Sequence, residues 1–425
     1  MPGRRRPGGN SAAGRRYRQV REHTWSGTEI VDGLRGLAIL WVFCYHTWLF
    51  SWYTPAWHPF GIAVPVDLFP RVGYLGVDLF FVISGFCLFM PGARRAVGGV
   101  PEPGLRSFGL RRVVKIVPSY ALVVFATIPF ALPYLGSQRG VWVALATHFA
   151  FLNSFYFDPF GQANSVFWSL AIEVQFYVLF PALAWVFRRA PLPAALGMIA
   201  TALAYRIHFS GCCLQNEIVV RELPAFLDVF ACGMLAAYCV TWGQRHVARL
   251  KNYGALMSLG TVVVAVATYF VLQTCNAVQY VPHGREAWDI YGRAAFGGLC
   301  GAFIVCACFA GRRLRAAIAN PVLVFLSLVS YNLYLWHTLV MIWMWKHGVP
   351  RAATPDPHAD DHWKFSYIVL GWSASFAIAT AVTYFLERPL LGTIKPHTFA
   401  FDWLRFVRRF NVRREPPIST PETRT

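Results

Sequence analysis

Two ionisable side chains interrupt an apolar stretch near the start of the chain, IVDGLRGLAILWVFCYHTWLF, which runs from Ile30 to Phe50. Arg35 lies close to its beginning and His46 well inside it. They are eleven positions apart, about three turns of an α-helix, so both project from one helix face about 16 Å apart along the axis. Ionisable groups are costly in hydrocarbon and usually mark a functional site. The structural alternative is an arginine that reaches the membrane surface and a hydrogen-bonded core histidine.

Three further cations, Arg111, Arg112 and Lys115, lie at the start of a later apolar stretch, in LRRVVKIVPSY. Such a cluster can be ordinary charge that flanks a membrane helix. The functional alternative is an anion site, because guanidinium groups form strong, charge-assisted hydrogen bonds with phosphate. Together with Arg35, these residues are the candidates for binding a phosphorylated ligand.

Polar side chains recur at helical spacing in the stretch SVFWSLAIEVQFYVLFP. Ser169, Glu173 and Tyr177 follow one another at intervals of four residues, so they form one stripe of a helix. Trp168 adjoins this stripe. A carboxylate inside an apolar helix needs a cation or a proton, so Glu173 is a candidate for the chemistry of a site.

Three more apolar stretches carry polar groups. In SLVSYNLYLWHTL, Ser330, Tyr334 and His337 again share one helix face. In GYLGVDLFFVISGF, Asp78 is either the structural partner of a nearby cation or a residue of the site. The stretch FLERPLL, which contains Glu387, is most simply a structural clamp and a helix end.

The elements that position these residues are expected to be membrane helices. Of the 425 residues, 56% are hydrophobic and only 14% are charged, whereas soluble domains have about 25% charged residues. The net charge of +19 is concentrated in short loops and two tails. This is the positive-inside pattern of membrane proteins and argues against nucleic acid as a partner; the lipid bilayer is the expected one.

The apolar blocks determine the expected topology. Eleven blocks occur, at 31–52, 72–91, 113–134, 141–156, 166–187, 192–208, 223–241, 254–273, 293–310, 322–346 and 366–386. Eleven crossings would place the two basic tails on opposite sides of the membrane, whereas the positive-inside rule expects both in the cytoplasm. One block should therefore not cross. Block 141–156 is the weakest candidate, because it is short and contains His148 and Asn153. We therefore predict an all-α polytopic membrane protein of the cell (inner) membrane. It has ten transmembrane helices, one re-entrant or interfacial helix within 135–165, and both termini in the cytoplasm.

The sequence further predicts a disordered basic cytoplasmic tail at 1–28, a membrane-embedded domain at 29–392 and a second basic cytoplasmic tail at 393–425. No cysteine shows zinc-ligand spacing with histidine, so no metal is expected. Cys212 or Cys213 is predicted on the same side of the membrane as Cys275 and able to pair with it, with three free thiols as the alternative.

Taken in order, these segments resemble the membrane-bound acyltransferase 3 family, which O-acylates sugars and related hydroxyls. The resemblance covers about residues 29 to 390 and rests on DGLRGLAILWVFCYH, GVDLFFVISGF, FWSLAIEVQFYVLFP, RELPAFLDVFACGMLAA, SYNLYLWH and ERP. The family's basic motif usually ends in arginine where this chain has Lys115, which keeps the charge but loses the bidentate fork. Some members carry a fused hydrolase-like domain, and this chain is expected to be the acyltransferase domain only.

The resemblance implies a cytoplasmic acyl-CoA donor, usually acetyl-CoA, a carbohydrate or glycosylated acceptor, and no permanently bound cofactor. It implies the following roles. Catalytic residues are His46, Glu173 and His337; donor-binding residues are Arg35, Arg111, Arg112 and Lys115; acceptor-binding residues are Asp78, Trp168, Ser169, Tyr177 and Tyr334.

Two questions stay open at the level of sequence. His46 acts either as a general base on the acceptor hydroxyl or as a nucleophile that is acylated first. The other functional class is a membrane transporter or lipid-binding scaffold without acyl transfer. Against a transporter, the sequence shows no pair of matching broken helices of the kind found in inverted repeats.

Overall fold

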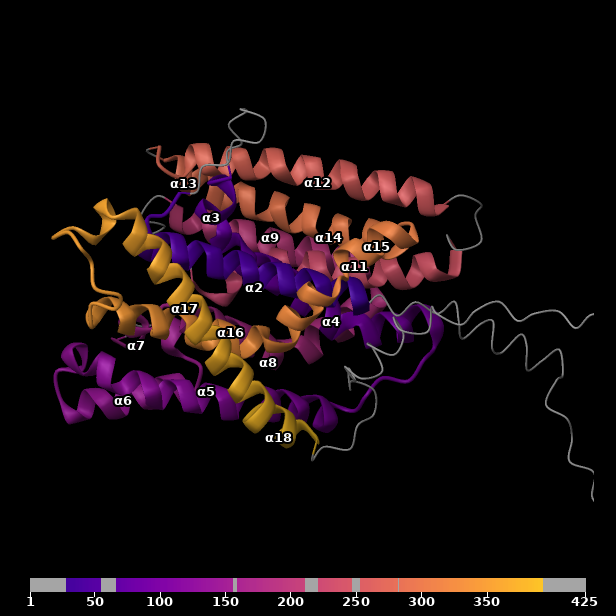
Figure 1. Cartoon of the computed structure of the whole chain (residues 1–425). Coiled ribbons are helices and arrows are strands. Elements are labelled where there is room, and N and C mark those ends of the chain that lie inside the picture. The colour runs from indigo at the N-terminus through magenta and orange to yellow at the C-terminus, as the bar shows by residue number, and fades with distance from the viewer. Residues whose placement is uncertain are drawn as a thin grey trace, which may run out of the picture.

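The computed structural model describes residues 28–54, 66–155, 159–210, 221–246, 253–281 and 283–392. Every regular element in these ranges is a helix, and the long helices form a bundle (Figure 1). The long helices are α2 (Thr28–Ser51), α4 (Gly76–Gly98), α5 (Leu105–Leu135), α8 (Phe167–Arg189), α9 (Pro191–Ser210), α11 (Leu227–His246), α12 (Tyr253–Val278), α14 (Arg293–Phe309), α16 (Pro321–Lys346) and α17 (Asp361–Val382). The short elements are α3 (Leu68–Arg71), η2 (Gly73–Leu75), α6 (Gln138–Phe149), η3 (Asn153–Phe155), α7 (Pro159–Ala163), η4 (Leu223–Phe226), α13 (Gly284–Ala287), η6 (Trp288–Gly292), α15 (Arg312–Ile318), η7 (Pro357–Ala359), η8 (Thr383–Glu387) and α18 (Arg388–Gly392).

The helix lengths confirm an all-α polytopic membrane protein. In the described ranges, nine helices are long and apolar enough to cross a membrane. The helix α2 is not among the nine, and it carries Arg35 and His46 in its interior. With 24 residues it is nevertheless about 36 Å long, which exceeds the hydrocarbon core of about 30 Å. Counting α2, the described chain has ten helices of spanning length.

The weakest predicted span is too short to cross. The separate helix α7, with 5 residues, follows block 141–156, and the block itself contains η3, which has 3 residues, and most of α6, which has 12. A helix of this length extends about 18 Å, well short of the hydrocarbon core. The segments α6, α7 and α13 lie at one end of the bundle and α15 lies at the other (Figure 1). With ten crossings, the end of α4, the start of α5 and the end of α8, which are rich in arginine, fall at the same end as α15.

The helix α2 lies in the interior of the bundle, in contact with α4 and α16. Its approach to α16 depends on Gly36, because a Cβ atom there would lie 1.9 Å from the carbonyl oxygen of Leu323. Small residues allow this close packing of membrane helices. The side chains of Arg35 and His46 are therefore held inside the protein and not at its lipid-facing surface.

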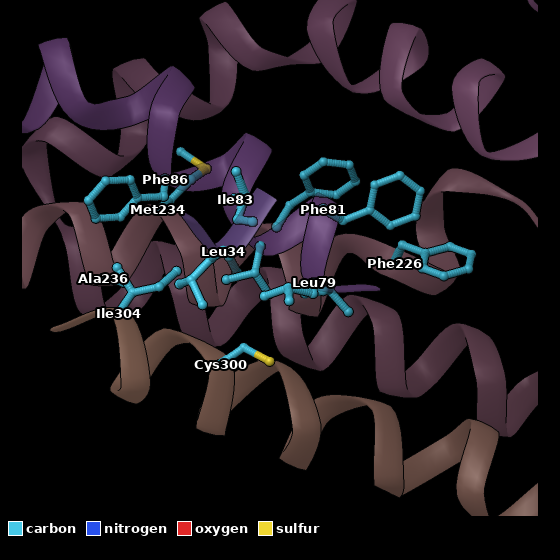
Figure 2. Packing of buried hydrophobic residues seen from close by; sticks show 14 of the residues in the cluster. Leu34, Leu79, Phe81, Ile83, Phe86, Phe226, Met234, Ala236, Cys300 and Ile304 are labelled. Carbon is cyan, nitrogen blue, oxygen red and sulfur yellow. The ribbon is translucent and has the colours of Figure 1, made fainter. Parts of the chain in front are cut away.

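A buried apolar cluster fixes the position of α4 against α11 and α14. Figure 2 shows its side chains, among them Phe81, Phe86, Met234 and Cys300. The cluster extends to α8, where Phe176 stacks on Phe230 of α11 with ring centroids 3.8 Å apart. Close packing of this kind leaves side chains few alternative positions, so the polar residues on the remaining faces of α4 and α8 are held in a defined arrangement.

Candidate active site

Two histidines predicted as catalytic from distant parts of the sequence meet in the structure. Nε2 of His337 lies 3.1 Å from Nδ1 of His46. Nδ1 of His337 lies 2.9 Å from the carbonyl oxygens of both Leu333 and Tyr334. A carbonyl oxygen only accepts hydrogen bonds, so we assign the proton of His337 to Nδ1. Nδ1 of His46 also lies 3.0 Å from the carbonyl oxygen of Val42, which can only accept, so His46 carries its proton on Nδ1. That proton is shared between the Val42 carbonyl and Nε2 of His337, which leaves a lone pair on Nε2 of His46.

The two histidines differ in exposure. His337 is completely buried, whereas His46 is partly exposed. The ring of Phe43 packs edge-on against His337 at 5.4 Å and stacks on Trp372 of α17 at 4.7 Å. His337 is thus the fixed member of the pair, and His46 is the member that a ligand can reach.

The backbone around His337 is held by Asn164, a residue that was not among the sequence candidates. Nδ2 of Asn164 donates a 2.9 Å hydrogen bond to the carbonyl oxygen of Leu335, and the hydroxyl of Thr338 donates to Oδ1 of Asn164. Asn164 follows α7 and is completely buried. The only signal in the sequence is an amide side chain within the polar segment DPFGQANS, which lies in the range 135–165 that was predicted to contain a re-entrant or interfacial helix.

The predicted polar stripe of α8 faces the same interior. Its first member, Ser169, lies 2.5 Å from the hydroxyl of Tyr334, whose ring centroid is 6.0 Å from that of His337. Trp168 packs beside Phe226 at 5.7 Å, and the guanidinium of Arg221 lies 5.4 Å from the Trp168 ring. Tyr334 and Ser169 therefore connect α8 with the histidine pair.

Glu173, one turn further along α8, is engaged separately. Its Oε1 accepts a 2.6 Å hydrogen bond from Ser84 of α4 and a 2.5 Å hydrogen bond from Tyr177. In the described part of the chain no hydrogen bond joins Glu173 to either histidine, although the three residues were predicted together as catalytic. The side chain that contacts the imidazole of His46 is instead His337.

Arg35 of α2 and Arg112 of α5 lie near these polar residues of α8, and we call them the basic end of the site. Arg35 lies 3.7 Å from Asp32 and 3.7 Å from Sγ of Cys87, with 33% of its side chain exposed. The guanidinium of Arg112 lies 5.3 Å from the ring centroid of Tyr177, and its buried Nε has no hydrogen-bond partner. Neither guanidinium is saturated by a close carboxylate, so both retain donors for an anion.

The other two predicted donor cations are placed differently. Arg111 donates a 2.6 Å hydrogen bond to Ser107 at the start of α5. Lys115 forms an ion pair with Glu387, which also accepts a 2.8 Å hydrogen bond from Asn332. The charge of Lys115 is therefore already matched within the protein, and the predicted clamp at Glu387 joins α5, α16 and η8. The helix does not end at this motif but continues through α18 to Gly392.

Asp78 does not contact the histidine pair among the described residues. It is buried and lies 3.6 Å from Arg293 of α14, which in turn lies 3.3 Å from Asp289. This arrangement is the structural partnership that the sequence left open for Asp78. Its predicted part in acceptor binding gains no contact from the structure.

These contacts define a continuous polar seam through the bundle. Arg112, Tyr177, Glu173 and Ser84 are linked in one group, and Ser169, Tyr334, His337 and His46 in a second. The two groups join along α8, where Ser169 and Glu173 are one turn apart. Partly exposed members occur along its whole length: Arg35, His46, Ser84, Arg112, Glu173, Tyr177 and Tyr334. Both groups of the seam therefore contain polar residues that are not fully buried.

One of the predicted disulfide partners is described. Cys275 is a free, buried thiol, and its Sγ lies 3.1 Å from the hydroxyl of Tyr74. Cys212 and Cys213 lie outside the described residues. The predicted pairing with Cys275 therefore stays a prediction.

The fold and the seam define the class of this protein as a polytopic membrane protein with an ionisable site enclosed by its helices. The family model of the acyltransferase domain, acyltransferase 3, matches residues 29–388, and the chain belongs to this family. No solved structure matches the chain.

Several curated relatives are similar to the chain. The peptidoglycan O-acetyltransferase OatA of Listeria monocytogenes is 24% identical, over 85% of this chain and 55% of its own. The O-acetyltransferase OatA of Staphylococcus aureus is 23% identical, over 74% of this chain and 50% of its own. YrhL of Bacillus subtilis is 25% identical, over 85% of this chain and 54% of its own. The chain thus spans about half the length of the curated relatives it matches.

Proposed function

We propose that this protein transfers an acyl group, most simply acetyl, from acyl-CoA to a hydroxyl of a carbohydrate acceptor. The observation that carries the proposal is the polar seam, with unsaturated guanidinium groups at one end and a hydrogen-bonded histidine pair with a free nitrogen lone pair at the other. Acyl transfer from a CoA thioester requires both an anion site and a base, separated by the length of an extended chain. Membership of the acyltransferase family and the names of the relatives support the same chemistry.

The donor is proposed to bind at the basic end. Arg35 and Arg112 would hold the phosphates of CoA through charge-assisted hydrogen bonds, and Arg111 lies on the same segment of α5. The pantetheine arm would then extend along α2, on the face shared by Arg35 and His46, for about 16 Å. The thioester would end beside His46. Lys115 would act indirectly, by holding Glu387 and the inner end of α16 in place.

His46 is proposed as the general base. Its Nε2 takes the proton of the acceptor hydroxyl while the hydroxyl oxygen bonds to the carbonyl carbon of the thioester. The carbon–sulfur bond breaks, and the proton on His46 passes to the departing thiolate, so that the products are an ester and free CoA. His337 stabilises the positive charge on His46 during this step, because its Nε2 accepts from Nδ1–H of His46.

The acceptor is proposed to be a sugar, because the names of the Listeria and Bacillus relatives include peptidoglycan O-acetyltransferase. It would approach the end of α2 that carries His46. Trp168 and Ser169, in the first turn of α8, and Tyr334 of α16 would bind it, with hydroxyls for hydrogen bonding and a partly exposed indole.

The orientation follows from charge. Arginines gather at the end of the bundle that contains α15 and the start of α5. From the positive-inside rule we propose that this end faces the cytoplasm. Both described chain ends would then lie on the cytoplasmic side, and the histidine end would face the outside of the cell (inner) membrane.

The test uses the full chain in lipid nanodiscs with radiolabelled acetyl-CoA and N-acetylglucosamine oligomers as acceptors. Labelled oligomer and stoichiometric free CoA, both lost in His46→Ala, are the expected result. Intact donor after incubation with every acceptor, together with unimpaired donor binding, would contradict the proposal and favour a transport or scaffold role.

A further inference from the structure

Four aromatic rings gather at the end of the bundle just beyond His46. They are Trp52, which follows α2, Trp345 in the last turn of α16, His358 in η7 and Trp363 in the first turn of α17. The ring centroid of His358 is 5.2 Å from that of Trp52 and 5.2 Å from that of Trp345, with interplanar angles of 33° and 28°. Trp363 meets His358 edge-on at 5.8 Å. We refer to these four residues as the end cluster.

Hydrogen bonds fix the position of the end cluster relative to the histidine pair. Nε2 of His358 lies 3.1 Å from the carbonyl oxygen of Phe50, and Phe50 is one helical turn beyond His46. Nε1 of Trp363 donates a 2.9 Å hydrogen bond to the carbonyl oxygen of Pro350. The rings therefore form a fixed surface at a defined distance from His46.

Two of the rings are exposed in spite of this fixation. Trp52 is 66% exposed and Trp345 is 43% exposed. Trp52 also has a φ of 55°, in the left-handed region where a helix normally ends with glycine or asparagine. A bulky residue in this conformation is uncommon, and strained positions of this kind concentrate at ligand sites. Core packing does not account for an exposed indole at such a position.

We propose that the end cluster is a carbohydrate subsite that binds the sugar residues flanking the one acylated at His46. This inference rests on the proposed function and extends it to an oligomeric acceptor. Pyranose rings present C–H bonds on their faces, and these bind to the electron-rich faces of aromatic rings. Trp52 is six residues beyond His46, about 9 Å along the helix axis, so one saccharide chain can reach both.

A carboxylate next to the rings completes the chemistry of such a subsite. Asp356 is 68% exposed, and its Oδ1 lies 3.5 Å from Nδ1 of His358. Carboxylate oxygens accept hydrogen bonds from sugar hydroxyls. Aromatic faces with an adjacent acceptor are therefore matched to a ligand with apolar faces and hydroxyl edges.

The competing explanation is the aromatic belt that membrane proteins place at the lipid–water interface. The helix α16 contains an internal control for it. Trp343 is also 43% exposed, but it lies two residues before Trp345, about 200° away around the helix. Its ring stacks on His347 at 4.6 Å and does not belong to the end cluster. If the tryptophans only anchor the protein in the membrane interface, replacing Trp343 or Trp345 has the same effect. If the end cluster binds sugar, only the replacement of Trp345, and not that of Trp343, weakens sugar binding.

The experiment measures binding without acyl transfer, by calorimetric titration of the full chain in nanodiscs with N-acetylglucosamine and with its β-1,4-linked tetramer. Trp52→Ala and Trp345→Ala are expected to weaken tetramer binding about tenfold, the effect of losing one aromatic contact of about 1.4 kcal/mol. Trp343→Ala is expected to bind the tetramer as the unmodified protein does. Trp345→Phe, which keeps an aromatic face, is expected to retain most of the affinity.

The outcomes separate this inference from the proposed function. Equal losses in Trp343→Ala and Trp345→Ala, or no binding of the tetramer to the unmodified protein, would overturn the subsite. Tetramer binding that depends on Trp345, in a protein that transfers no acyl group, would refute the proposed function and leave the subsite in place.

Discussion

Asn164 donates a 2.9 Å hydrogen bond to the carbonyl oxygen of Leu335. That carbonyl is two residues before His337, and Thr338, one residue after it, donates to the same amide side chain. The short segment between α7 and α8 thus holds the turn of α16 that presents the buried histidine. The segment between α5 and α8, which does not cross the membrane, therefore helps to position His337 through Asn164.

Asn164→Ala should therefore lower kcat by roughly 10- to 100-fold, because small displacements of a catalytic group have effects of this size. The KM for the donor should change little, since the basic end of the seam is remote from Asn164. Steady-state kinetics in nanodiscs checks this. Thr338→Val should show the same pattern more weakly, and Thr338→Ser should restore activity. A change confined to donor KM would argue against a positioning role.

The histidine pair leads to a second prediction. His46→Ala should abolish acyl transfer, and His337→Ala should reduce kcat by about 10²–10⁴-fold, the usual contribution of a general base and its support. With labelled donor and no acceptor, a general base leaves the protein unlabelled. An acyl label on the imidazole of His46, detected by mass spectrometry, would instead establish the nucleophilic mechanism. Near-normal transfer by a well-folded His46→Ala protein would remove His46 from the site.

Arg35→Ala and Arg112→Ala should each raise the KM for acyl-CoA. A hydrogen bond to a charged group contributes about 1.5–3 kcal/mol, equivalent to roughly 10- to 150-fold in affinity. Arg189 is the matched control, because it is exposed at the same end of the bundle and its guanidinium lies 3.7 Å from the ring centroid of Trp185. If the KM for acyl-CoA is unchanged in both variants, Arg35 and Arg112 do not bind the donor, and their charges only reflect the positive-inside rule.

Lys115 should behave as a structural residue. Lys115→Met leaves the carboxylate of Glu387 without its cation, and a buried group that loses its partner destabilises a protein by about 1–3 kcal/mol. Thermal unfolding in nanodiscs should shift down, and the double variant Lys115→Met with Glu387→Gln should recover most of the loss. If Lys115→Met instead raises the KM for acyl-CoA as much as Arg35→Ala does, without loss of stability, then Lys115 binds the donor.

Topology can be tested with single introduced cysteines in a background without accessible native thiols. An impermeant maleimide added to intact cells should label Ser210→Cys and Ala277→Cys, which lie at the histidine end of α9 and α12. It should not label Arg245→Cys, which is exposed at the opposite end of α11. Disrupted cells should label all three. Labelling of Arg245→Cys alone in intact cells would reverse the orientation.

The features that depend on local periodicity could be predicted from the order of residues. Block length identified the membrane helices, and the weakness of 141–156 separated it from the true spans, because α6 is only 12 residues long. Spacing alone placed Arg35 and His46 on one face of α2, and Ser169 and Glu173 on one stripe of α8. The helix repeat converts sequence spacing directly into direction, so these relations needed no knowledge of the neighbouring helices.

The contacts between distant residues could not be predicted in this way, and the folded structure shows them. It paired His46 with His337 across 291 positions of sequence, and it matched Lys115 with Glu387 across 272. It placed Asp78 with Arg293 in the core, and it brought Asn164, which carries no motif, to the backbone of α16. Helical periodicity says which way a side chain points but not what lies opposite. That depends on how α2, α4, α8 and α16 pack, which is set by close contacts such as Gly36 against Leu323.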